Sequence, residues 1–157
     1  MLEESSILNM ASECENTITI FANAATIEEL RQVEFNPEVF LPTPYYEEGD
    51  RRWITWRYEN WGTKRMYRFR VLREGVKGLV FKITSVRGPP IPFFKFLLNK
   101  FPEMKLKCEF LDENGYGGIW IGKNVEGQDE VGPKIYCQTW EDFDEDDYYE
   151  GFFAEDN

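Results

Sequence analysis

The chain contains no histidine, only three cysteines and no long hydrophobic run. Without histidine it lacks the side chain best suited to proton transfer near neutral pH, which is also the commonest metal ligand. These absences argue against a serine-triad hydrolase, a catalytic zinc centre and a histidine-based pH switch. We therefore expect a protein that is not an enzyme and that carries no metal and no cofactor.

The sequence also gives no sign of a membrane span or a secretory leader. The longest apolar stretch, residues 91–98, contains a proline and a lysine and is far shorter than the about 20 residues that cross a bilayer. Cys14, Cys108 and Cys137 are odd in number and widely spaced, which favours reduced structural thiols over a disulfide framework. We expect a cytoplasmic protein that does not bind membranes.

The charge of the chain is strongly segregated along the sequence. The net charge of −11 divides into −10 for residues 1–50, +12 for 51–107, −4 for 108–140 and −9 for 141–157. Like charges that gather on one surface attract opposite charge over about 8 Å at physiological salt. The basic block could therefore bind phosphates, and the acidic ends could occupy a basic groove on another protein. Alternatively, folding lays acidic loops against basic strands and neutralises both.

Hydrophobic periodicity predicts most of the secondary structure. Strands are expected at residues 15–21, 53–58, 65–72, 79–86, 105–111, 116–122 and 135–140. In the third of these, the expected inward residues are Tyr67, Phe69 and Val71, and the expected outward residues are Lys64, Met66, Arg68 and Arg70.

Two helices and one long loop complete this prediction. Thr26 is expected to cap a short helix, with Glu29 completing a capping box. A second helix is expected over residues 92–100, and its apolar stripe consists of Phe94, Leu97, Leu98 and Phe101. Residues 36–50 contain three prolines and several acids, and they predict a long loop.

The element order strand, helix, strand, strand, helix, strand is typical of an α+β protein with a ferredoxin-like split βαβ sandwich. Such a fold has an antiparallel sheet with two helices on one face. We predict one domain of this kind over residues 13–140, with an extra hairpin strand and an insertion at about 36–63. Residues 1–12 are predicted to form a flexible N-terminus, and 141–157 an acidic, aromatic tail.

Four segments resemble one known family. They are CENTITI (14–20), ENWGTK (59–64), FKITSVRGPP (81–90) and FPEMKLKCEFLDENGYGG (101–118). Together they resemble the YubB ferredoxin-like domain family, which phages and conjugative plasmids carry. The NWGTK segment matches the family pattern fully, whereas Val86-Arg87-Gly88 stands where that pattern has a Trp-Ser pair.

The resemblance covers about residues 13–127 and implies an origin in a mobile genetic element, but no established reaction. Small acidic proteins of such elements that lack catalytic equipment are often inhibitors of host defences directed at nucleic acids, and this analogy guides the functional prediction.

The acidic tail is the strongest functional signal. Residues 141–157 contain nine carboxylates, no base and five aromatic side chains. We expect the tail to present a nucleic-acid-mimicking surface to a host defence protein or ribonucleoprotein complex with a basic groove, as an anti-CRISPR or anti-restriction factor would. The alternative is a disordered, solubilising tail. The partner-binding residues that we predict are Asp142, Asp144, Glu145, Asp146, Asp147, Tyr148, Tyr149 and Glu150.

A second functional hypothesis rests on the basic, aromatic segment of residues 51–73. Guanidinium groups on phosphates and rings under bases are the means by which proteins hold single-stranded nucleic acid. The residues predicted for this role are Arg57, Arg68, Arg70, Trp56 and Trp61. The competing interpretation is a two-sided sheet, with its aromatic side chains inward and its bases in solvent.

Overall fold

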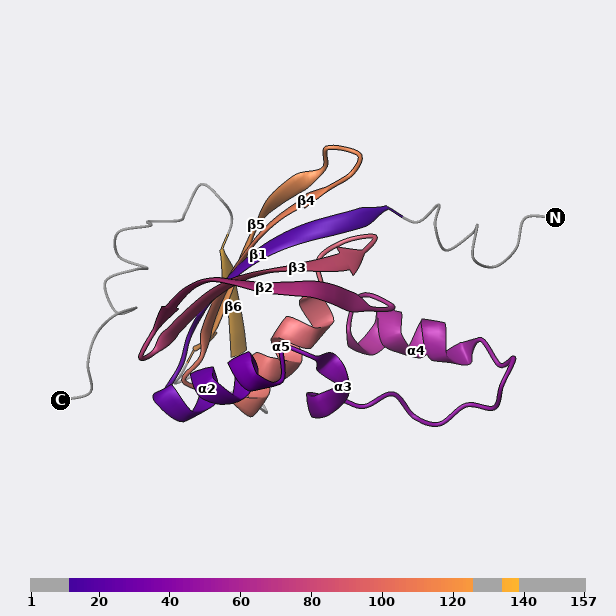
Figure 1. Cartoon of the computed structure of the whole chain (residues 1–157), viewed down its shortest axis with the longest axis horizontal. Helices are drawn as coiled ribbons and strands as arrows, with labels where there is room; N and C mark the ends of the chain where they lie inside the picture. Colours follow the sequence, from indigo (N-terminus) through magenta and orange to yellow (C-terminus); the bar gives the residue numbers. More distant parts are fainter. Residues whose placement is uncertain (1–11, 126–133, 139–157) are drawn as a thin grey trace.

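The computed structural model of the chain describes residues 12–125 and 134–138, and it describes side chains as far as Lys123. The acidic tail of residues 141–157 and nearly all of the predicted flexible N-terminus lie outside the described residues. The described residues form a twisted sheet with helices packed below it (Figure 1).

The elements follow one another in an α+β order. They are β1 Glu13–Phe21, α2 Ala24–Gln32, α3 Pro37–Phe40, α4 Arg52–Asn60, β2 Met66–Gly75, β3 Gly78–Val86, α5 Ile91–Lys100, β4 Lys105–Asp112, β5 Gly117–Val125 and β6 Lys134–Gln138. Within the described residues the sheet has six strands in the order β2-β3-β1-β4-β5-β6, and every neighbouring pair is antiparallel. This architecture is compatible with the predicted ferredoxin-like class.

The core lies between one face of the sheet and the helices. Along β1, Ile18 and Ile20 are fully buried, and they pair in register with residues of β3 and β4 that are also buried. Helix α5 contributes most from the other side, because its buried residues are Phe93, Phe94, Leu97 and Leu98. The predicted apolar stripe of this helix is therefore confirmed for three of its four members, and Phe101 is partly buried against the core.

Residues 53–58 form a helix, so the strand predicted there is wrong. Helix α4 spans Arg52–Asn60, and the backbone N–H of Arg52 donates to Asp50 Oδ1 over 2.9 Å just before it. Tryptophan, tyrosine and threonine suggested a strand through their β propensity. A helix forms instead because Trp53, Arg57 and Trp61 are spaced four residues apart and stack on one helical face.

Two predictions in the segment before α4 are corrected as well. The N-cap of α2 is Asn23, whose side chain accepts from the Thr26 N–H over 2.9 Å, so Thr26 lies inside the helix and is buried. The predicted loop of residues 36–50 contains the short helix α3, with Asn36 as its N-cap and a proline in its first turn.

Strand β2 does not alternate as predicted. Its pairing with β3 shifts between Tyr67 and Arg70, and Arg68 has a φ of 60°, which marks a β-bulge. Phe69 stays on the core side, where its ring centroid lies 5.0 Å from that of Phe81. Tyr67 points to the opposite face, as its hydrogen bond to Glu13 shows. The bulge therefore separates Tyr67 from the inward set to which it was assigned.

Gly62, which follows α4 in the chain, packs very closely against the start of α5. Gly62 has a φ of 83°, and a Cβ at this position would lie 2.5 Å from Pro92 Cδ and 3.2 Å from the Ile91 nitrogen. Only glycine combines this backbone conformation with so close an approach. None of the helices in the described part of the chain has the length and apolarity that a membrane span requires.

We expect Gly62→Ala to lower the free energy of unfolding by about 2–4 kcal/mol, because the new methyl group meets α5 while the backbone remains left-handed. The matched control is Gly49→Ala. Gly49 has a φ of 88° but nothing within 4 Å of its Cβ position, so only the backbone cost of about 1 kcal/mol applies. Urea unfolding measures both, and equal losses would contradict the close packing.

Candidate functional site

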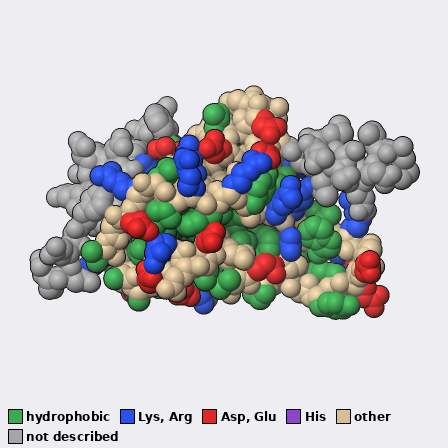
Figure 2. All heavy atoms as spheres, in the orientation of Figure 1, with side chains coloured by type: hydrophobic (Ala, Val, Ile, Leu, Met, Phe, Trp, Pro, Cys, Tyr) green, Lys and Arg blue, Asp and Glu red, His purple; other side chains and the backbone are tan. Residues whose placement is uncertain are grey.

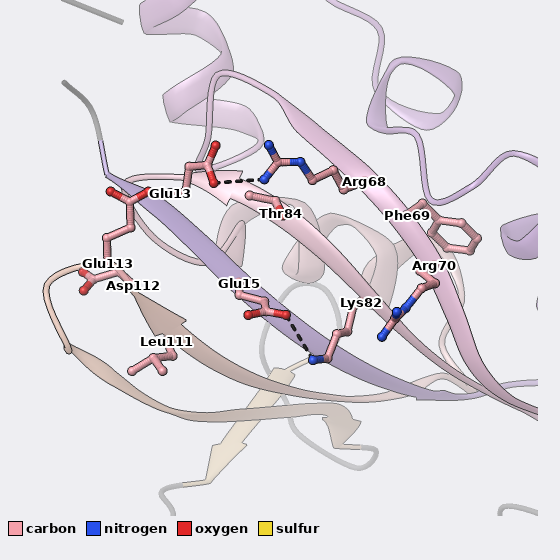
Figure 3. A pocket seen from close by; sticks show the side chains of 10 residues that line it. All are labelled: Glu13, Glu15, Arg68, Phe69, Arg70, Lys82, Thr84, Leu111, Asp112 and Glu113. Atoms are coloured by element: carbon pink, nitrogen blue, oxygen red, sulfur yellow. Dashed lines mark hydrogen bonds and ion pairs between the residues drawn. The ribbon is translucent and has the colours of Figure 1, made fainter. Parts of the chain in front are cut away.

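The face of the sheet opposite the helices, called the open face below, contains a hollow of about 680 Å³ at one end (Figure 3). Strand alternation places Glu13 and Glu15 of β1 on this face, because Cys14 and Asn16 are buried on the other. The residues that line the hollow are Glu13, Glu15, Arg68, Phe69, Arg70, Lys82, Thr84, Leu111, Asp112 and Glu113.

Charged side chains pair across the strands of this hollow. Figure 3 shows Arg68 turned from β2 toward Glu13, and Lys82 turned from β3 toward Glu15. The Arg68 Nη1 lies 3.1 Å from Glu13 Oε2, and the Lys82 Nζ lies 3.1 Å from Glu15 Oε1. The hollow is therefore mixed in charge, and red and blue side chains also lie among one another on the side of the molecule that Figure 2 draws.

Glu13 accepts a hydrogen bond at each of its two carboxylate oxygens. The Tyr67 hydroxyl donates to its Oε1 over 2.6 Å, and Arg68 binds its other oxygen. The Tyr67 hydrogen bond, helped by the positive charges of Arg68 and Arg65, lowers the pKa of Glu13 from its ordinary value. Both arginines also lie over the Tyr67 ring, at 4.7 Å for Arg65 and 5.1 Å for Arg68.

The left-handed backbone at Arg68 is what directs its guanidinium to Glu13. Non-glycine residues rarely adopt a positive φ, and a bulge re-aims the side chains around it. Its neighbour in the hollow, Arg70, forms no ion pair with any described residue and is exposed. Arg68 and Arg70 thus share the hollow, but only Arg70 keeps its charge uncompensated by the described chain.

The other residues predicted to bind nucleic acid are used inside the molecule. The Arg57 guanidinium lies between the rings of Trp53 and Trp61, at 4.7 and 4.6 Å from their centroids. Its Nε donates to Thr43 Oγ1 over 3.0 Å, and its Nη1 donates to the Lys64 carbonyl over 2.9 Å. Arg57 therefore ties the segment before α4 to the start of β2, and burial lowers its pKa.

The two predicted tryptophans are also structural. Trp61 is 1% exposed, and its Nε1 donates to the Leu41 carbonyl over 2.9 Å. Trp56 packs edge-on against Trp61, with 5.9 Å between the ring centroids, and is partly buried against the core. The structure therefore brings Arg68 and Arg70 together in the hollow and separates them from Arg57, Trp56 and Trp61, so the five do not form one surface.

Sequence reasoning missed Glu13, Glu15, Tyr67 and Lys82 as members of a common site. The charge blocks contained a signal, because acids of the first block must lie near bases of the second if the two neutralise each other. The register of β1 with β3 decides which acid meets which base, and that register is a tertiary property. The predicted partner-binding residues of the tail lie outside the described residues.

The two described thiols lie in the core. Cys14 and Cys108 are both fully buried, and each Sγ donates weakly to Asn16 Oδ1, over 3.8 and 3.5 Å. Burial raises the pKa of Cys14 to about 11 and that of Cys108 above its ordinary value. The prediction of structural thiols is supported for these two. In the part of the chain that the structure describes, no cluster of three acidic or sulfur ligands could hold a metal ion.

We expect Arg57→Lys to lower the free energy of unfolding by about 1–3 kcal/mol, because an ammonium group cannot bridge Thr43 and the Lys64 carbonyl while stacking on two indole rings. Arg70→Lys is the matched control. It is exposed and forms no ion pair with a described residue, so its effect is expected within about 0.5 kcal/mol. Similar losses for both variants in urea unfolding would show that Arg57 is not a structural residue.

Glu13 predicts a pH dependence with a definite sign. Because folding lowers its pKa, its contribution to stability is fully present above the ordinary value of 4.5 and is lost as pH falls through the folded value. We expect Glu13→Gln to cost less than about 1 kcal/mol at pH 7, since the side chain is 38% exposed. The difference from the wild type should shrink below about pH 4.5.

Urea unfolding between pH 3 and 7 measures this difference. Tyr67→Phe serves as the companion variant, because it removes only the hydroxyl that contributes most to lowering the Glu13 pKa. A pH-independent difference for both variants would contradict the assignment.

Comparison with known proteins leaves the site to be interpreted from its own geometry. No family model, no curated protein and no solved structure matches this chain. The resemblance to the YubB family stays a prediction.

Proposed function

We propose that this chain is a non-catalytic binding protein of a phage or plasmid, and that it inhibits a host defence complex directed at nucleic acid. In this proposal it acts as an anti-CRISPR or anti-restriction factor in the host cytoplasm. The acidic tail of residues 141–157 occupies the basic groove of the host complex. Tyr148 and Tyr149 anchor it, and the carboxylates that substitute for phosphates are those of Asp142, Asp144, Glu145, Asp146, Asp147 and Glu150.

The observation that carries the proposal is the internal neutralisation of the basic block. Ion pairs among the described residues join acids of residues 1–50 to bases of residues 51–107. They include Glu13–Arg68 at 3.1 Å, Glu15–Lys82 at 3.1 Å, Glu38–Arg57 at 3.8 Å and Asp50–Arg52 at 2.7 Å. The basic block therefore uses part of its charge within the fold, and the side of the molecule drawn in Figure 2 is mixed in sign.

This pairing leaves the tail as the densest unbalanced charge in the sequence. Its nine carboxylates are accompanied by no base, and the whole chain carries −11. Exposed acids of the described loops, such as Glu47, Glu48 and Glu113, add to the negative total. The chain is therefore better suited to bind a partner through its own negative charge than through its positive charge. A basic groove on the partner is the complement of that negative charge.

The arrangement of the sheet supports the finer fold assignment. The four strands that flank the two main helices in sequence lie in the order β2-β3-β1-β4, and β5 and β6 extend the sheet beyond β4. This order favours a ferredoxin-like split βαβ sandwich with an added hairpin strand. Fold class by itself identifies no activity, so the functional proposal rests on charge alone.

A second candidate, a single-stranded nucleic-acid-binding protein, is favoured by one observation. Arg70 lies exposed in the hollow beside Arg68, and no described carboxylate pairs with it. The candidate is weaker because Glu13 and Glu15 line the same hollow and would repel a phosphate backbone. Its aromatic platform is also missing, since Trp61 is buried and Trp56 packs against it.

We expect deletion of residues 141–157 to abolish inhibition of the host defence complex, because it removes nine negative charges and both tyrosine anchors. The deletion should leave circular dichroism and the unfolding midpoint of the domain unchanged. A full-length variant in which the six predicted carboxylates become amides distinguishes the effect of losing the negative charge from the effect of losing the segment. Interference assays in cells with an active defence system, and pull-downs from the same host, measure the loss.

Full inhibition by the truncated, folded chain would remove the tail from the proposal. A gel-shift assay with a single-stranded oligonucleotide distinguishes the second candidate function from the acidic mimic. Direct binding that weakens steeply with salt and is lost in Arg70→Gln would favour that candidate over the acidic mimic.

A further inference from the structure

Lys64 is a buried lysine that has no charged partner in the part of the chain that the structure describes. The residue is only 6% exposed, although lysine is almost never buried unless it is paired. Its ammonium group forms no hydrogen bond and no ion pair with any described residue, unlike Lys82, which binds Glu15 at 3.1 Å. A buried polar group without a partner requires an explanation, and a missing water or ion is a common one.

The charges around Lys64 are positive. Burial lowers the pKa of Lys64, and the positive charges of Arg65, Arg87 and Arg51 lower it further. Arg65 and Arg87 are exposed, whereas Lys64 is buried. Like charges that lie close together repel one another and so raise the free energy of the unliganded protein. An anion that binds among them offsets this repulsion.

The backbone that holds this group is rigid. The Val86 N–H donates to Thr63 Oγ1 over 2.8 Å, which fixes the chain just before Lys64 to the chain just before Arg87. The Lys64 carbonyl accepts from Arg57 Nη1 over 2.9 Å. A site whose side chains stand on so constrained a backbone is preorganised for its ligand.

Two further features of the backbone define the surroundings of Lys64. Gly62 lies against the first turn of α5, so the positive end of that helix dipole faces the same junction. Arg87 has a φ of 72°, and its guanidinium lies 5.8 Å from the centre of the Tyr58 ring, which restricts where this side chain can point. Strain of this kind at an exposed arginine is typical of a residue that is positioned for binding.

We propose that Lys64, Arg65 and Arg87 form a binding site for a phosphate group. Guanidinium groups bind phosphate oxygens in pairs, and a lysine between two arginines supplies the third donor to a tetrahedral oxyanion. A phosphate offers more acceptor oxygens than a carboxylate to the three donors, and a phosphate monoester also carries nearly two negative charges where a carboxylate carries one. The ligand is therefore a phosphate, supplied either by a small phosphorylated molecule or by the backbone of a nucleic acid.

This site goes beyond the proposed function. It shares no lining residue with the hollow on the open face, although Arg65 stacks on Tyr67, which bonds to Glu13 of that hollow. None of its residues belongs to the hollow or to the acidic tail. Binding of phosphate and inhibition through the tail can therefore fail independently. Deleting residues 141–157 tests the tail, whereas changing Lys64 tests the phosphate site.

The test measures binding of inorganic phosphate and of a 5′-unphosphorylated single-stranded oligonucleotide to the full chain, by amide chemical shifts in NMR titrations. Saturable shifts at residues 62–65 and 87 are expected for at least one of the two probes. A response to inorganic phosphate indicates a small ligand, and a response to the oligonucleotide alone indicates a nucleic-acid backbone. No saturable response to either probe would overturn the proposal.

Lys64→Met is expected to weaken this binding by about tenfold or more, since it removes one charged donor without opening a void. Lys82→Met is the matched control, because it removes the same charge from a lysine on the open face, and it should change binding less than about threefold. Equal weakening by both variants would show only a general charge effect and would overturn the site.

Arg87→Gln keeps the test conclusive if Lys64→Met does not fold. Arg87 is exposed, so its replacement leaves the core unchanged while removing a guanidinium from the same site. It should also weaken binding by about tenfold. Unchanged binding in a folded Arg87→Gln variant would overturn the assignment of that residue and of the cluster.

Discussion

Pairing between the acidic first third of the chain and its basic middle decides which charges remain for a partner. β1 lies between β3 and β4, so its glutamates fall beside bases that are more than fifty residues away in sequence. Each exposed pair is worth little in stability, about 0–1 kcal/mol. Their larger effect is on the surface, because a paired arginine no longer offers an isolated positive charge to a nucleic acid.

The junction between α4, β2 and α5 depends on a second, more local set of contacts. Arg57 stacks on two indole rings, Trp61 bonds to Leu41, and Thr63 bonds to Val86. The NWGTK segment that carries the family resemblance is this junction. Its first residues serve the fold, and its last, Lys64, is buried and has no charged partner among the described residues. One short segment thus combines a structural role with the binding role that we propose for Lys64.

The sequence was sufficient where burial has a simple period. The strands around Ile18, Phe81 and Leu106 and the helix of Leu97 were found because apolar side chains recur every two or every three to four residues. The sequence was insufficient for α4, where aromatic residues with high β propensity form a helix whose side chains stack on Arg57. Stacking between side chains four residues apart on one helical face there overrides the β propensity of the individual residues, which depends strongly on context.

The candidate site, like the fold, was predictable from the sequence only in part. That the basic block meets acids follows from composition, but which arginine stays unpaired depends on the bulge at Arg68 and on strand register. Neither feature has a sequence pattern of its own, because a left-handed arginine is selected by its surroundings. Lys64 escaped notice for a similar reason, since it was assigned to the solvent side of a strand and is in fact buried.

The two charged groups that we propose as binding sites, the acidic tail and the cluster at Lys64, have opposite signs, and this constrains how each can act. A tethered acidic segment is present near its own domain at an effective concentration of about millimolar, whatever its external partner. An external basic groove must therefore compete with the chain's own cations for the tail, and a phosphate ligand must compete with the tail for Lys64, Arg65 and Arg87. Raising salt weakens the exposed contacts of both kinds, but it acts less on a buried ammonium group. The depth of Lys64 thus favours a phosphate monoester over a carboxylate of the tail, because two negative charges offset more of the free-energy cost of burying that ammonium group.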